Sequence, residues 1–206
     1  MKIGIQLVLP AILALLPAWA VAGAVDQLQA FARDTRSARG EFTQAVSSRT
    51  RKANVPSQGE FAFERPGKFR WAYLKPHEQV IVADGQTLTI YDKDLNQATV
   101  RKQDDALGTT PAAILFGSND LAKRFVLKES GVRDGIEWLE ATPNARDTSF
   151  ETIRIGFRDG ALAAMELRDA LGQTTMLTFA KVVRNAAVAA DTFRLVLPKD
   201  ADVLRN

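Results

Sequence analysis

The chain has 206 residues, no cysteine, and 27 lysines and arginines against 24 aspartates and glutamates, which gives a net charge of +3. This charge is too small for the electrostatic footprint of a nucleic-acid-binding protein, so we expect no nucleic-acid partner. The lack of cysteine excludes a disulfide framework and thiolate metal sites. A chain of this length can bury one self-sufficient hydrophobic core without such staples.

The first 24 residues have the layout of a secretory signal peptide. Lys2 precedes an apolar run at 3–16, and alanine then occupies every second position from 18 to 24. This is the order of a charged region, an apolar region and a small-residue cleavage site. We therefore interpret residues 1–24 as a cleaved signal peptide and residues 25–206 as one mature domain.

Two alternatives to this boundary stay open. Cleavage after Ala22 would make Gly23 the first residue of the mature chain. An uncleaved anchor is also conceivable, because residues 3–25 approach the length of about 20 apolar residues that spans a bilayer. Pro10, Pro17 and the alanine cluster favour cleavage.

A short amphipathic helix is expected to open the mature domain. Val25, Leu28, Phe31 and Ala32 fall on one helical face, and Asp26 lies near the helix start. This spacing predicts a helix that packs its apolar face against the rest of the fold.

The segment 47–58 contains the one basic cluster, R-T-R-K at 49–52, among serine, asparagine, proline and glycine residues. We interpret it as a solvated loop between the helix and the first strands. Contact with an acidic patch on a partner is the alternative.

The stretch 59–91 carries the most informative pattern of the chain. Phe69, Trp71 and Tyr73 recur at period two, so one face of the expected strand is a row of large rings. An Arg-Pro pair at 65–66 precedes this row and places one cation at the edge of an apolar surface.

Turn dipeptides divide most of the remaining chain into strands. An Asp-Gly pair between β-rich runs is a strong hairpin signal. The turns are expected at Asp84-Gly85, Asp134-Gly135, Asp159-Gly160 and Leu171-Gly172, and the last strand is expected at 193–197. This order predicts a meander of antiparallel strands without helical crossovers.

A helical interlude is expected at 110–124. Thr110 can cap the helix, Pro111 suits its first position, and the apolar run 112–116 must lie on an apolar surface. The fold class is therefore mainly β with some α. We expect a single-domain incomplete antiparallel β-barrel, or half-barrel, covered by the N-terminal helix and short lid helices.

Five short motifs occur in the chain in a recognisable order. They are F-T-Q at 42–44, R-P-G-K-F-R-W at 65–71, D-G-Q-T-L at 84–88, N-Q-A-T at 96–99 and T-P-A-A-I-L at 110–115. They cover roughly residues 28–120, and a weaker strand-by-strand likeness continues to Pro198. In this set and order the chain resembles the LolA family of periplasmic outer-membrane lipoprotein carriers.

The resemblance implies a soluble periplasmic chaperone. Its partners would be acylated lipoproteins as cargo, an inner-membrane ABC transporter that supplies them, and an outer-membrane receptor of LolB type. That receptor is itself a lipoprotein and needs a cysteine after its signal sequence, so the cysteine-free chain favours the shuttle. We expect a monomer without a cofactor.

The resemblance also implies a cavity for acyl chains on the aromatic face. Its residues would be Phe61, Phe63, Trp71, Tyr73, Leu88, Ile90 and Ile114. From the residues alone a filled core is the other interpretation, because aromatic stripes at strand spacing usually pack against one another.

Arg65 is expected to control the opening of that cavity. The rigid guanidinium can bond backbone carbonyls of a lid, and the resemblance implies a latch between Arg65 and the Leu115 region. A surface arginine that closes a turn is the alternative. The resemblance further implies that Phe69 contacts the inner-membrane transporter.

Enzymatic interpretations have little support. His77, the only histidine, follows a proline and is expected in an exposed turn. Asp92 and Asp94 lack the later glutamate of a calcium loop, and there is no nucleophile or phosphate-loop motif. A lipid- or lipoprotein-sensing regulatory domain of the same fold is the main alternative function, and a binder of another lipid is a third.

Overall fold

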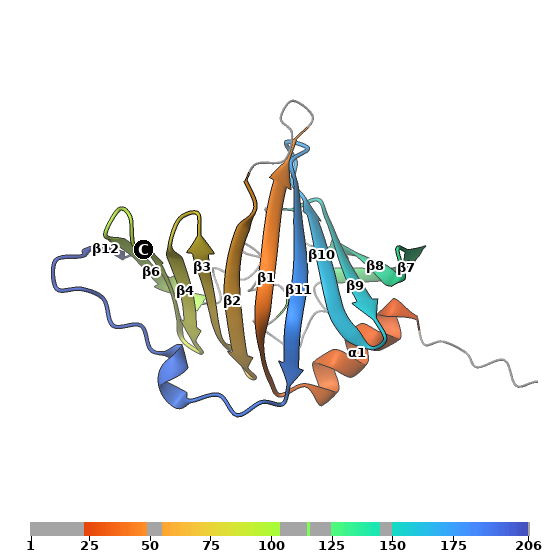
Figure 1. Ribbon diagram of the computed structural model, residues 1–206, viewed down its shortest axis with the longest axis horizontal. Helices are drawn as coiled ribbons and strands as arrows, with labels where there is room; N and C mark the ends of the chain where they lie inside the picture. Colours follow the sequence, from red (N-terminus) through yellow and green to blue (C-terminus); the bar gives the residue numbers. More distant parts are fainter. Residues whose placement is uncertain (1–22, 49–54, 104–114, 116–124, 145–149, 206) are drawn as a thin grey trace, which may run out of the picture.

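The computed structural model describes residues 23–48, 55–103, 115, 125–144 and 150–205. Within them one helix, α1 (Ala24–Asp34), packs against one large open sheet (Figure 1). The strands are β1 (Ser37–Ser47), β2 (Ser57–Glu64), β3 (Lys68–Lys75), β4 (Gln79–Asp84), β5 (Thr87–Asp92), β6 (Gln97–Lys102), β7 (Phe125–Arg133), β8 (Ile136–Pro143), β9 (Thr152–Arg158), β10 (Ala161–Arg168), β11 (Thr174–Arg184) and β12 (Asp202–Arg205).

The described strands form a twelve-stranded sheet in the order β12-β6-β5-β4-β3-β2-β1-β11-β10-β9-β8-β7. Strands β1 and β11 meet at its centre and join the two halves of the chain. In the described part of the chain β12 and β7 are the two edges and do not pair with each other. The sheet is thus unclosed and has one helix on it, which confirms the incomplete barrel.

The expected hairpin turns are confirmed. Gly85 lies between β4 and β5 with φ +99°, a conformation that glycine adopts without steric cost. The Asp134-Gly135 and Asp159-Gly160 pairs also connect successive strands, and all four residues have positive φ. These turns set the register of the antiparallel pairs around them.

Helix α1 forms where the apolar spacing predicts it. Leu28 and Phe31 are buried on the sheet, together with Ala24. Its N-cap, Gly23, has no side chain to bond the first backbone amides. Instead Glu129 of β7 accepts hydrogen bonds from the amides of Ala24 at 3.0 Å and Val25 at 2.9 Å, so a strand far along the chain caps the helix.

The two faces of the sheet differ in chemistry. We call the face that carries the buried core and α1 the inner face, and the opposite one the outer face. Burial alternates along β2 and β3, because successive side chains point to opposite faces. The inner face includes Phe42, Phe61, Phe63, Phe69, Trp71, Leu88, Leu139, Ile155, Phe157, Met165 and Leu177.

The expected last strand at 193–197 is wrong. The chain forms a short 3-10 helix, η1 (Ala190–Phe193), and residues 194–198 pair with no described strand. Phe193 and Leu195 instead lie against outer-face residues of β4 and β5 such as Val82. Residues 193–197 form an extended segment that crosses the outer face of the sheet, so alternate side chains point toward the sheet. This alternation is the same pattern that a strand would show.

The expectation of a purely antiparallel meander also fails at the C-terminus. After η1 the chain reaches the far edge of the sheet, where β12 pairs parallel with β6 (Figure 1). A parallel neighbour needs a long connection, and residues 185–201 supply it without a helical crossover of the usual kind.

The basic segment 49–52 was expected between the helix and the first strand. It lies instead in the connection between two strands, because β1 ends at Ser47 and β2 begins at Ser57. Residues 49–54 themselves, the signal sequence and all of the expected interlude 110–124 except Leu115 are outside the described residues.

Candidate functional site

An aromatic cluster occupies the inner face of β1, β2, β3 and β11. Phe42 stacks on Trp71 with ring centroids 3.9 Å apart, and Phe61 lies parallel to Trp71 at 6.0 Å. Phe179 meets Phe61 and Trp71 edge-on at 5.7 and 6.3 Å. Tyr73 closes the cluster beside Phe42 at 5.2 Å. Offset and edge-on contacts of this kind are the favourable geometries for rings.

The structure brings together the described members of the expected cavity. Phe61, Phe63, Trp71 and Leu88 are buried on the inner face, with Tyr73 and Ile90 partly buried against the same core; Ile114 is outside the described residues. Tyr73 also donates its hydroxyl to Gln44 Oε1 at 2.9 Å, and burial raises the pKa of this phenol. The lining of an acyl-chain cavity by these residues stays a prediction.

The structure also brings Arg65 and Leu115 together. Arg65 Nη2 donates to the carbonyl oxygen of Leu115 at 3.4 Å, and Arg65 Nε donates to the carbonyl oxygen of Thr35 at 3.1 Å. One guanidinium therefore contacts Thr35 at the end of α1 and Leu115 at once. The role of this contact as a latch stays a prediction.

Aromatic rings surround the same guanidinium. Arg65 Cζ lies 5.1 Å from the ring centroid of Phe63 and 5.9 Å from that of Phe31. Phe31 in turn packs edge-on against Phe63 and Phe157. Burial lowers the pKa of Arg65 from its usual value, yet arginine remains a cation at neutral pH. A cation over ring faces is attracted by their quadrupoles.

Phe69, the residue expected to contact the transporter, is fully buried on β3. Its ring therefore does not reach a partner in this conformation. The expected contact stays a prediction, and it requires a conformation in which the inner face is open.

Sequence reasoning missed three contributors to this site. Phe42 lies within the F-T-Q motif and Phe31 lies on the apolar helix face, but neither pattern reveals that Phe42 stacks on Trp71 or that Phe31 packs against Phe63. Gln103 is also buried: its amide donates to the Gly67 carbonyl at 2.7 Å and accepts from the Gly85 amide at 3.1 Å. It ties the β2–β3 turn beside Arg65 to the β4–β5 turn.

The structure supports the expected exposure of His77. Its side chain is 82% exposed and its Nδ1 lies 2.9 Å from Asp94 Oδ2 in a surface pair. Across the described ranges no group of three or more acidic or histidine residues could hold a metal ion. Among the described residues, no helix is long and apolar enough to span a membrane.

The fold and the inner face together define a class of protein: an open, curved sheet whose apolar inner face is covered by a helix and bordered by a half-buried arginine, Arg65. Two solved structures share this fold. One is an uncharacterized conserved protein from Thermus thermophilus, with TM-score 0.56, 13% identity, and coverage of 86% of this chain and 95% of that chain. The other is a LolA superfamily protein from Nitrosomonas europaea, with TM-score 0.51, 12% identity, and coverage of 85% and 99%.

The chain belongs to the LolA family, because the family model described as outer membrane lipoprotein carrier protein LolA matches residues 33–196. Similar proteins named outer-membrane lipoprotein carrier protein occur in several bacteria. That of Cupriavidus necator is 58% identical over 90% of this chain and 89% of its own. That of Ralstonia nicotianae is 56% identical over 93% of both chains, and that of Neisseria meningitidis serogroup B is 43% identical over 91% and 89%.

Proposed function

We propose that this protein is a soluble periplasmic chaperone that carries acylated lipoproteins to the outer membrane. The observation that carries this proposal is the match to lipoprotein carriers along nearly the whole chain, at 43% to 58% identity. The cargo would come from an inner-membrane ABC transporter and pass to an outer-membrane receptor of LolB type. We assign the protein no catalytic role.

The periplasmic location follows from the leader. Residues 1–24 would be removed during export and residues 25–206 would form the carrier domain. Without a cysteine the mature chain has no attachment point for acyl chains of its own. It can therefore shuttle between the membranes instead of staying on one.

The inner face supplies the physical basis for carriage. Each CH₂ group transferred from water to an apolar site contributes about 0.8 kcal/mol, so one long acyl chain contributes on the order of 10 kcal/mol. The ring cluster around Trp71, with Leu88 and Ile90 beside it, offers an apolar surface on which such chains can lie. The chains would replace some of the contacts that the rings now make with one another.

Arg65 would control that exchange. Its hydrogen bonds join the sheet to Thr35 at the end of α1 and to Leu115. Hydrogen bonds from a charged donor contribute about 1.5–3 kcal/mol each. This is small beside the transfer of several acyl chains, so the latch would favour release to a receptor without preventing loading. Its opening would also uncover Phe69 for the transporter.

Spheroplasts that synthesise a radiolabelled triacylated lipoprotein provide the test. Purified protein is added, and the soluble fraction is examined for the lipoprotein in a one-to-one complex. A cargo whose acylated cysteine is replaced by serine is the matched control, because it has nothing to shield. Failure to release the acylated cargo, beside a working carrier from another bacterium, would exclude carriage and favour a sensing role or another lipid.

A further inference from the structure

A groove lies on the outer face of the sheet. It has a volume of about 680 Å³ and is bounded mainly by outer-face residues of β1, β2, β3 and β11, with Gly40 and Phe61 at its floor, and by the segment 187–192 that leads into η1. Its volume falls within the range of small-ligand sites. The acyl-chain function proposed above makes no use of it.

Two arginines line this groove from either side of a small residue. Arg39 of β1 and Arg70 of β3 are both in register with Ala62 of β2. Neighbouring strands are about 4.8 Å apart, so the two arginine backbones are separated by about 10 Å with only the Ala62 methyl group between them. The guanidinium groups can therefore approach a common point above Ala62.

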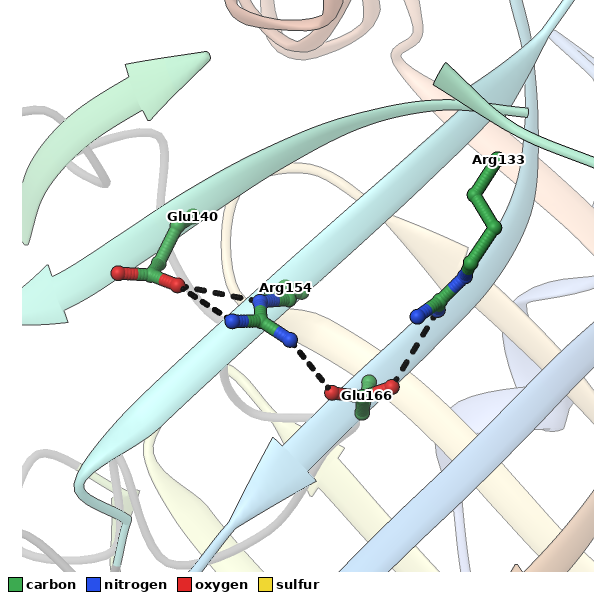
Figure 2. A network of polar contacts seen from close by, with 4 residues as sticks. All are labelled: Arg133, Glu140, Arg154 and Glu166. Carbon is green, nitrogen blue, oxygen red and sulfur yellow. Dashed lines mark hydrogen bonds and ion pairs between the residues drawn. The ribbon is translucent and has the colours of Figure 1, made fainter. Parts of the chain in front are cut away.

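Neither arginine is neutralised by a direct contact. Arg39 is exposed and Arg70 half-buried, and in the described ranges no carboxylate lies within ion-pair distance of either. By contrast, Arg154 on the other half of the same face pairs with two glutamates (Figure 2). Arg39 and Arg70 thus keep their donors available in a hollow of the surface.

The other charges of the groove lie one row further along the strands. Glu41 and Glu60 face each other across β1 and β2, and Lys181 pairs with Glu41 at 2.7 Å. Lys181 therefore screens Glu41, while Glu60 makes no ion pair with a described residue. Three cations against two carboxylates leave the groove with a charge of +1, concentrated at the two arginines.

We propose that this groove binds a phosphate group between Arg39 and Arg70. The tetrahedral oxygens of phosphate point in several directions, so two guanidinium forks can each bond a different pair from opposite sides. A carboxylate has only two oxygens in one plane and suits a single fork. Ala62 leaves the space that the anion occupies. The phosphate could come from a soluble phosphomonoester or from a phospholipid headgroup.

Two probes distinguish these sources. Glycerol 3-phosphate is titrated into the purified protein by calorimetry at low ionic strength, and phosphatidylglycerol vesicles are used in a flotation assay. Arg39→Gln with Arg70→Gln removes both forks, and Arg168→Gln with Arg205→Gln is the control with the same change in net charge at exposed positions outside the groove. A far-ultraviolet circular dichroism spectrum checks that each variant is folded.

We predict that the groove variant loses about tenfold or more in affinity for the probe that binds the wild-type protein. The control variant should show no comparable loss of affinity. Glu60→Gln removes a repulsive charge and should tighten binding. Binding of the soluble probe alone assigns a free phosphate source, and binding of vesicles assigns a headgroup. The proposal is overturned if neither probe binds, or if the groove and control variants weaken binding equally.

Discussion

Arg65 Nη2 donates a hydrogen bond to the carbonyl oxygen of Leu115, and the two residues are fifty positions apart in the chain. Through the same guanidinium the turn before β3 also reaches the end of α1 at Thr35. A cation placed in this way can hold three separate segments of the chain together.

Arg65→Leu should leave loading intact and impair delivery. The substitution removes the hydrogen bonds from Arg65 to the carbonyl oxygens of Leu115 and Thr35. Hydrogen bonds from a charged donor contribute about 1.5–3 kcal/mol each, so the balance between loaded and empty forms shifts toward the loaded form by about tenfold or more. Transfer of labelled lipoprotein from the preloaded protein to receptor-containing membranes measures this. Arg168→Leu, at an exposed position, is the control. Unloading of Arg65→Leu at the wild-type rate would exclude the latch.

Trp71→Ala should lower the free energy of unfolding by about 3–5 kcal/mol, because it removes a buried ring that stacks on Phe42 and contacts Phe61 and Phe179. Urea denaturation followed by circular dichroism measures the change. Arg70→Ala, on the neighbouring position that faces outward, should change stability by no more than about 0.5 kcal/mol. A loss below about 1 kcal/mol for Trp71→Ala would show that the ring packs loosely.

In a chain that begins at Gly23, the alternative mature N-terminus, Glu129→Gln should loosen the start of α1. The two carboxylate oxygens of Glu129 accept one hydrogen bond each, from the backbone amides of Ala24 and Val25. A glutamine side chain has only one acceptor oxygen. Loss of a helix cap typically lowers stability by about 0.5–2 kcal/mol. Hydrogen exchange at the first turn of α1 should accelerate relative to wild type. Glu151→Gln is the control, and equal exchange in both variants would contradict the capping role.

Protonation of Asp84 should lower the free energy of unfolding in the acid pH range. Burial alone would raise the pKa of Asp84, but hydrogen bonds from Thr87 and Gln86 outweigh burial and lower it. A lowered folded-state pKa means that the stabilisation is fully present above the unfolded value of about 3.9 and is lost as the pH falls through the folded value. Asp84→Asn should therefore be less stable than wild type at pH 6, and the difference should shrink below pH 4. A constant difference from pH 6 to pH 2.5, measured by urea denaturation, would contradict this account.

Local patterns in the sequence predicted the elements that depend on neighbouring residues. The helical spacing of Val25, Leu28, Phe31 and Ala32 predicted α1, and the Asp-Gly pairs predicted the hairpins. The ring row of β3 identified the inner face, because period two assigns alternate residues to one face. These signals act over a few residues and are readable without the tertiary fold.

Contacts between distant segments could not be predicted in this way. The capping of α1 by Glu129 joins residues about a hundred positions apart, and the parallel pair of β12 with β6 depends on how the sheet ends. The approach of Arg39 and Arg70 depends on the register of three strands. Residues 193–197 alternate like a strand only because they lie across the sheet.

Carriage by this protein requires that acyl chains lie on the inner face. Site-specific photo-crosslinking tests it most directly, with a photoreactive phenylalanine analogue at Leu88 on the inner face or at Val183, which is 48% exposed and borders the outer groove. Each variant is loaded with acylated cargo or with cargo whose acylated cysteine is serine. We predict crosslinks from position 88 to the acylated cargo alone, and none from position 183. Crosslinks from position 183 with none from position 88, or equal crosslinks to both cargoes, would contradict carriage on the inner face.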